Sequence, residues 1–225
     1  DTQGLDVTTA GQLEPRVRTW YNPEKRSSDF LIPGLMVVII MVVAVQQTAV
    51  SLVREREQGT DEQLAISPLR GWEMMIGKLA PWTLLAFAEL AAITAVGVWF
   101  FHLPLRGSLG VLALGAALFV FCSLGLGLVI SAVAPTLESA NMLGLLLSIL
   151  PAFILSGFAF PLGSIPVALQ AFSWLFPARF MVAISRGVFL KGAGVAELWP
   201  ELLTLAGYAV VVIAVAVVLS ARRRR

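Results

Sequence analysis

Charge is the property that this chain has least of. Asp, Glu, Lys and Arg make up 13% of its 225 residues, whereas hydrophobic residues make up 58%. The mean hydropathy is +0.85. A water-soluble domain is nearer a quarter charged and half apolar. The shortage of charge therefore argues against an ordinary soluble domain and predicts an integral membrane protein.

Cysteine and histidine are also scarce, with one of each at Cys122 and His102. A single cysteine cannot form a disulfide within the chain, and a lone histidine far from it in sequence argues against a metal site. No Asp follows Asp61. An intramembrane protease or lipid transferase, which needs Ser with His or paired Asp, is an alternative with little support.

The beginning of the chain lacks both Met and the pattern of a signal peptide. Residues 1–29 are polar, and no basic leader precedes a short apolar run. We expect the chain to be a processed or truncated piece of a longer protein.

Long apolar runs dominate the rest. A helix crosses about 30 Å of hydrocarbon with about 20 residues. Segments of that length lie at approximately Phe30–Val53, Leu79–Phe101, Leu109–Val133, Met142–Phe160 and Leu198–Ser220. The predicted fold is an all-α polytopic membrane protein with five transmembrane helices. Five spans place the two ends of the chain on opposite faces.

The basic residues give an orientation. Four consecutive arginines, Arg222–Arg225, follow the last span directly, and dense positive charge beside a span marks the cytoplasmic side. Residues 54–78 would then also be cytoplasmic, with residues 1–29 and 161–197 external. The external segment 161–197 is still apolar but divided by prolines, so we expect two short helices that lie at the interface or re-enter the bilayer.

The segment 54–78, which we call the elbow, begins with the charged run "REREQGTDEQL". Gly59 allows a sharp turn, and Thr60 with Gln63 fits a capping box for a short helix Asp61–Ile66. Ser67 and Pro68 would start a second helix. Its pattern alone also fits a solvated loop. Its length and two capped helices favour a functional connector parallel to the membrane.

Two motifs resemble one known family. The run "EREQGTDEQLAISPLRGWEMMIGKLAP" is similar to the loop after the second span in permease subunits of type 2 ATP-binding-cassette (ABC) exporters. The later run "LSGFAFPLGSIPVALQAFSWLFPARFMVAISRGVFLKGAG" is similar to the long external connection of that family, here an external re-entrant helical hairpin. The family residues matched there are Ser156, Gly157, Phe158, Pro161, Pro166 and Pro177.

The resemblance implies a division of the chain. Family members have six spans, so this chain would hold spans two to six in a transmembrane permease domain, residues 30–225. Residues 1–29 would be the remnant of an external segment or domain.

The resemblance also implies a transport subunit and not an enzyme. Two permease copies, identical or different, would form the pathway, and separate cytosolic ATPase subunits would bind ATP and Mg. No cofactor is expected on this chain, because Gly71–Lys78 matches only part of a phosphate loop and Leu79 stands where Ser or Thr is needed. A structural membrane-assembly subunit without transport activity remains a further alternative.

Two sets of candidate residues follow. In the family the elbow docks on the ATPase, which makes its acids candidates for charge-assisted contacts with basic residues there. The residues predicted at this partner interface are Glu55, Arg56, Glu57, Gly59, Thr60, Asp61, Glu62, Leu64 and Pro68. Within the spans, Glu89, Gln46 and Gln47 are candidates for a pathway or gating role. The alternative for Glu89 is a structural hydrogen bond, and for the glutamines it is contact between helices.

Overall fold

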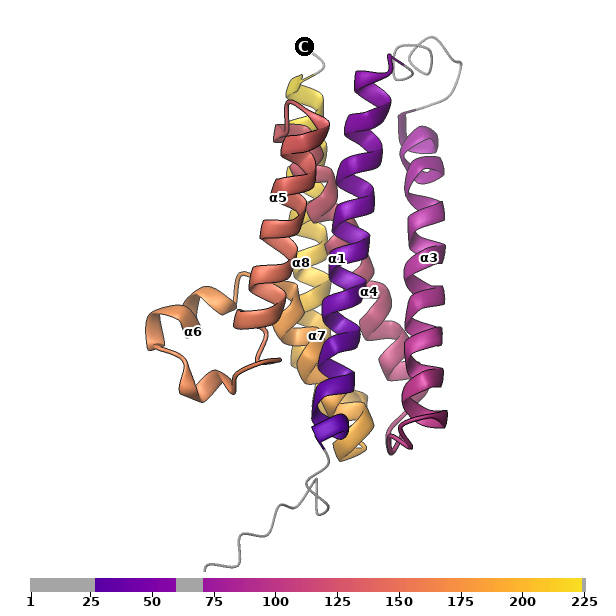
Figure 1. Cartoon of the computed structure of the whole chain (residues 1–225), viewed down its shortest axis with the longest axis vertical. Coiled ribbons are helices and arrows are strands. Elements are labelled where there is room, and N and C mark those ends of the chain that lie inside the picture. The colour runs from indigo at the N-terminus through magenta and orange to yellow at the C-terminus, as the bar shows by residue number, and fades with distance from the viewer. Residues whose placement is uncertain (1–26, 60–70, 224–225) are drawn as a thin grey trace, which may run out of the picture.

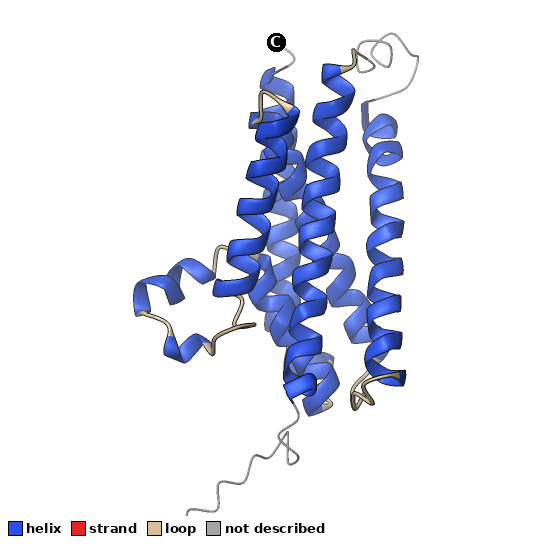
Figure 2. Ribbon diagram, viewed as in Figure 1, coloured by secondary structure: helices blue, strands red, loops and turns tan. Residues whose placement is uncertain are grey.

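Every regular element in the part of the chain that the structure describes is a helix. The computed structural model describes residues 27–59 and 71–223 (Figure 2). The long helices are α1 (Ser27–Glu57), α3 (Gly71–Trp99), α4 (Leu109–Val133), α5 (Leu137–Leu150) and α8 (Val195–Arg223). The shorter ones are η2 (Pro151–Leu155), η3 (Leu162–Ser164), α6 (Val167–Ser173), α7 (Pro177–Arg186) and η4 (Gly187–Lys191).

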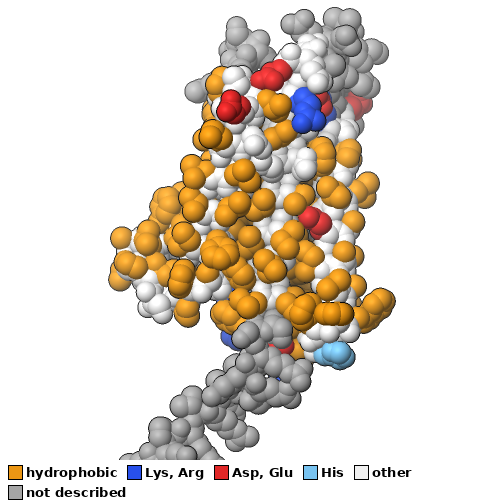
Figure 3. Space-filling model, in the orientation of Figure 1, with side chains coloured by type: hydrophobic (Ala, Val, Ile, Leu, Met, Phe, Trp, Pro, Cys, Tyr) orange, Lys and Arg blue, Asp and Glu red, His pale blue; other side chains and the backbone are white. Residues whose placement is uncertain are grey.

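Five of these helical stretches are long and apolar enough to cross a membrane, which confirms the predicted number of spans. They are Asp29–Glu57, Ile76–Trp99, Leu109–Val133, Leu137–Leu155 and Val195–Leu219. Hydrophobic side chains cover the middle of the face shown in Figure 3, and most of its charged side chains lie toward the two ends. That distribution suits a surface that faces lipid between two aqueous phases.

The fourth span begins and ends earlier than the predicted Met142–Phe160. Thr136 and Ser139 form a reciprocal capping box that starts α5 at Leu137, so the polar residues before Met142 form its first turn instead of a connector. The helix continues through the π-helical turn η2 and ends before Gly157, which has a φ of +83°. A left-handed glycine is a common helix terminator.

The end of the elbow also differs from the prediction. The second elbow helix is not separate from the next span, because α3 runs without a break from Gly71 to Trp99 with Pro81 inside it. Membrane helices tolerate an internal proline more readily than soluble ones do. The predicted helix Asp61–Ile66 and the restart at Ser67 and Pro68 lie outside the described residues.

Helices α1 and α4 form the centre of the bundle. Helix α1 packs against α3, α4, α5 and α7, while α4 packs against α8 as well (Figure 1). Glycines permit the closest approaches between these helices. A Cβ at Gly127 would lie 2.6 Å from Cβ of Thr48 on α1, and one at Gly125 would lie 2.8 Å from Val212 on α8.

The proline-divided segment forms two short helices, as predicted, but they lie in different surroundings. Helices α6 and α7–η4 meet at an angle of 87°. Helix α7 packs in the bundle through Phe180, Met181 and Ile184, whereas α6 projects away from it (Figure 1). Hydropathy did not distinguish the two, because both are apolar.

The close approach of α1 and α4 can be tested at Gly127. Gly127→Leu forces a side chain into space that Thr48 already occupies, which we expect to cost about 1–3 kcal/mol in stability. Gly207→Leu on α8 is the matched control, since a Cβ there meets nothing within 4 Å. Thermal unfolding in detergent should show a lower midpoint for the first variant only; equal midpoints would contradict the packing.

Candidate functional site

The last residues of α1 contact three other helices at one end of the bundle. We call Arg54–Glu57 the charged end of α1. Glu55 forms an ion pair with Lys78 on α3 at 2.6 Å. Arg56 donates through Nη2 to the Ser131 carbonyl of α4. Oε1 of Glu57 accepts a hydrogen bond from the Leu137 amide of α5 at 2.6 Å.

Arg56 provides a donor that the end of α4 lacks. The Ser131 carbonyl would normally accept from the residue four positions later, but that residue is Pro135, which has no N–H. A cation at the carboxyl end of a helix also interacts favourably with the helix dipole. The guanidinium of Arg56 therefore caps α4.

Glu57 provides the matching acceptor at the start of α5. The first N–H groups of a helix have no partner within it. Thr136 Oγ1 accepts from the Ser139 amide, and Glu57 accepts from the Leu137 amide. A carboxylate at a helix N-terminus is favoured by the dipole. Adjacent residues of opposite charge thus cap helices that meet at the α4–α5 connection.

The ion pair between Glu55 and Lys78 joins the two ends of the elbow. Their side chains are 32% and 16% exposed, so solvent screens the pair only in part. The motifs in the sequence did not pair Lys78 with Glu55. The pairing could have been predicted, because a short connector between antiparallel helices brings the residues on its two flanks together.

A polar hollow of about 570 Å³ opens beside the charged end of α1. Its lining comes from α1 and from the start of α5, namely Val50, Arg54, Glu57, Thr136, Leu137, Glu138 and Asn141. The lining of the hollow combines both signs of charge, from Arg54 on one side and from Glu57 and Glu138 on the other.

The other residues predicted at the partner interface fall into two groups. Gly59 has a φ of +71° and its amide donates to the Arg56 carbonyl at 3.1 Å, which confirms the predicted turn out of α1. Thr60, Asp61, Glu62, Leu64 and Pro68 lie outside the described residues. Their role remains a prediction.

The two candidate glutamines differ in position. Gln46 donates through Nε2 to the Asn141 side chain, and its Oε1 lies where a Cβ on Gly144 would be only 2.4 Å away. It therefore joins α1 to α5, as the helix-contact alternative proposed. Gln47 is exposed on the neighbouring face of α1.

Glu89 lies half-buried within the second described span. Its Oε2 is buried and has no hydrogen-bond partner in the described residues. The structure thus does not show the structural hydrogen bond considered for this oxygen. Glu201, near the start of α8, also has a buried Oε2 without such a partner, so Glu89 is not alone in this respect.

The residues of the second motif surround a tight turn after η2. Ser156 Oγ accepts from the Phe158 amide at 3.1 Å, and the Phe158 ring lies where a Cβ on Gly34 would clash. Pro177 is buried and starts α7. Pro161 and Pro166 are exposed and flank η3.

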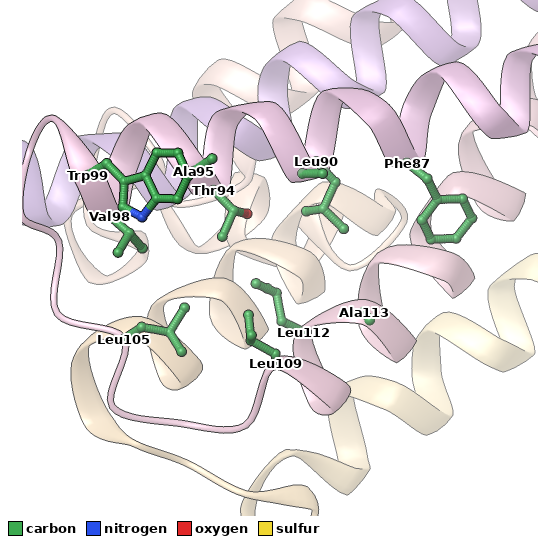
Figure 4. Close-up of a pocket in the computed structure, with 11 residues that line it drawn as sticks. Phe87, Leu90, Thr94, Ala95, Val98, Trp99, Leu105, Leu109, Leu112 and Ala113 are labelled. Carbon is green, nitrogen blue, oxygen red and sulfur yellow. The ribbon is translucent and has the colours of Figure 1, made fainter.

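An apolar groove of about 510 Å³ lies between α3 and α4 (Figure 4). Phe87, Leu90 and Trp99 line it from α3, and Leu109 and Leu112 from α4. Thr94 is the one lining residue with a hydroxyl group, and it donates to Sδ of Met36 at 3.8 Å. The groove offers no group for acid–base or metal chemistry.

The bundle, its charged end and its divided hairpin together define the class of protein. Residues 11–190 match the ABC-2 type transporter family, so the chain belongs to that family and is a type 2 ABC permease subunit. This confirms the resemblance found in the two motifs.

Curated relatives carry the same designation. The chain is 34% identical over 186 residues to "Probable multidrug ABC transporter permease YbhR" of Escherichia coli K12, covering 83% of this chain and 50% of that protein. It is 33% identical over 180 residues to YbhS, named in the same way (80% and 48% covered). It is 32% identical over 200 residues to "Inner membrane transport permease YhhJ" (86% and 51% covered). The chain spans about half the length of these relatives.

The cap that Glu57 provides can be tested by hydrogen exchange. Glu57→Ala removes the acceptor of the Leu137 amide, and loss of a helix cap costs about 1 kcal/mol. We expect severalfold faster exchange in the first turn of α5. Glu138→Ala is the control, because it removes a charge from the same turn and leaves the cap. Equal exchange in both variants would show that charge alone matters.

The ion pair can be tested by exchanging its charges. Glu55→Lys and Lys78→Glu each place like charges together, whereas the double variant restores an opposite pair. We expect each single variant to lower the thermal midpoint and the double variant to recover most of the loss, with a coupling of about 0.5–1 kcal/mol for a partly screened pair. Strict additivity of the two losses would mean that the residues do not interact.

Proposed function

We propose that this chain is the permease subunit of an ATP-driven exporter, and that the charged end of α1 transmits movement of the elbow to the bundle. The observation that carries the proposal is the set of contacts from Glu55, Arg56 and Glu57 to α3, α4 and α5. A connector that only joined two spans would not require its flank to cap two further helices.

The contacts give a physical route for coupling. Both flanks of the elbow are tied together by Glu55 and Lys78, so a force on the elbow acts on α1 and α3 as a unit. Arg56 and Glu57 would carry the same displacement to the end of α4 and the start of α5. The hollow that Arg54 and Glu138 line lies beside this junction and offers charged groups to a partner.

We infer the sidedness from the helix ends together with the basic residues. Helices α1 and α8 both end at the upper end of the bundle in Figure 1, so the charged end of α1 and the last residues of α8 share one face. Dense basic residues favour the cytoplasmic side for that face. Residues 1–29 and 161–197 would be external. The name of YhhJ supports placement in the inner membrane.

The remaining parts of the proposal rest on the family. Two cytosolic ABC ATPase subunits would bind ATP and Mg and dock on the elbow, and two permease copies would form the pathway. Glu89 and Gln47 are our candidates for residues that face the pathway, since one has an unpartnered carboxylate oxygen and the other is exposed. The names of YbhR and YbhS support a multidrug ABC transporter as the kind of system.

Copurification tests the assignment of the elbow. In the full-length permease, Asp61→Lys with Glu62→Lys reverses charge in the elbow, and we expect severalfold less ATPase subunit to copurify. Glu197→Lys is the matched control at the opposite end, where the Glu197 carboxylate accepts from the amide of Gly194. Undiminished copurification of the elbow variant, with ATP hydrolysis stimulated as in the wild type, would reject this docking site.

A further inference from the structure

Arg186 connects segments that are far apart in sequence, at the end of the bundle opposite the charged end of α1. Its Nη1 donates to the Gly157 carbonyl at 2.9 Å, and its Nη2 donates to Phe158 and Phe30 carbonyls at 3.3 and 3.4 Å. The guanidinium also lies over the Phe30 ring, with Cζ 3.6 Å from its centroid. One side chain on α7 thus holds both the turn after η2 and the first turn of α1.

The neighbouring residue strengthens the same connection. Ser185 is buried, and its hydroxyl donates to the Pro33 carbonyl of α1 at 3.1 Å. Side chains at consecutive positions of α7 therefore bind the backbone of α1. The end of α7 is attached to α1 by hydrogen bonds as well as by apolar packing.

The turn that Arg186 holds packs on α1. The Phe158 ring packs on Gly34 of α1 and makes an edge-on contact with Phe153, with ring centroids 5.2 Å apart. Ala152 and Leu155, which precede this turn in η2, are buried. If the Gly157 and Phe158 carbonyls left Arg186, the Phe158 ring would lose its support against α1.

The chemistry of the contact suits a reversible attachment. A planar guanidinium can bind several carbonyls at once, which an ammonium group cannot do in the same geometry. The acceptors are neutral backbone oxygens, which water or other carbonyls can replace. The opposite end of the bundle also has a guanidinium that binds a carbonyl, that of Arg56, but it adds an ion pair and a carboxylate cap.

We propose that Arg186 is a positioning residue that keeps this end of the bundle closed, and that its release from the Gly157–Phe158 turn accompanies opening during transport. The closing contact rests on the geometry alone, whereas the release step rests on the proposed function. The two parts can therefore fail separately.

Labelling of a buried cysteine tests the closing contact. Leu155→Cys is introduced into the full-length permease, with its ATPase partner in proteoliposomes, after Cys122→Ala removes the native thiol. A membrane-impermeant maleimide should label Leu155→Cys poorly without ATP, and severalfold faster when Arg186→Gln is added. Arg186→Lys should give an intermediate rate.

Arg179→Gln is the matched control. Arg179 also binds backbone and a ring, but its partners, Gln170, Ser173 and Trp174, all lie within the hairpin. The Arg179→Gln variant should therefore leave the labelling rate of Leu155→Cys unchanged. Ala140→Cys, buried near the other end of α5, should remain protected in Arg186→Gln.

Three results would overturn the proposal. If Leu155→Cys is labelled at the same rate with and without Arg186→Gln, Arg186 does not keep this end of the bundle closed. Faster labelling at Ala140→Cys as well would show general loosening of the bundle. The third result concerns Leu155→Cys with Arg186 retained, in a complex that hydrolyses ATP. If ATP does not change its labelling rate, the release step is wrong, whereas the copurification result is unaffected.

Discussion

The backbone groups at the ends of α4 and α5 set the constraint on which this structure depends. Because Pro135 has no N–H, the Ser131 carbonyl lacks its usual helical donor. The first amides of α5 have no acceptor within their own helix. Near a membrane such groups are costly to leave unpaired. Arg56 and Glu57 satisfy one group at each helix, each with the sign of charge that the helix dipole favours.

That arrangement explains why dense charge follows directly on an apolar span. The charges hold the spans together at one face, and Glu55 adds α3 through Lys78. The other face is held by one guanidinium, a serine hydroxyl and aromatic packing. Both ends thus use a guanidinium that binds backbone carbonyls, and the charged end of α1 adds an ion pair and a carboxylate cap.

Much of the fold was predictable, because apolar length is a local property. The five spans and the division of segment 161–197 at its prolines follow from runs of sequence, and so does the turn at Gly59. The start of α5 was missed because its polar first turn resembles a loop, and its capping box uses Ser139 in place of the usual Glu or Gln. The burial of α7 and the projection of α6 depend on tertiary packing that hydropathy does not encode.

The candidate site was predictable in its residues but not in its contacts. A burst of acids and arginines beside a span fits a partner surface, a solvated loop or caps for neighbouring helices, and only the positions of α4 and α5 distinguish these. Pro135 was the available signal for Arg56, since a proline four residues after a helical carbonyl leaves that carbonyl without a donor. The contacts of Arg186 join segments too distant for any local pattern to connect.

We propose that the charged end of α1 carries the effect of nucleotide from the elbow to the bundle. Hydrogen exchange in the permease–ATPase complex, with and without ATP, measures this most directly when Arg56→Gln and Glu57→Ala are combined. The account predicts that ATP alters exchange at the end of α4 and the start of α5 in the wild type, and that the variant loses this response while it still binds and hydrolyses ATP. An undiminished response in the variant would contradict it.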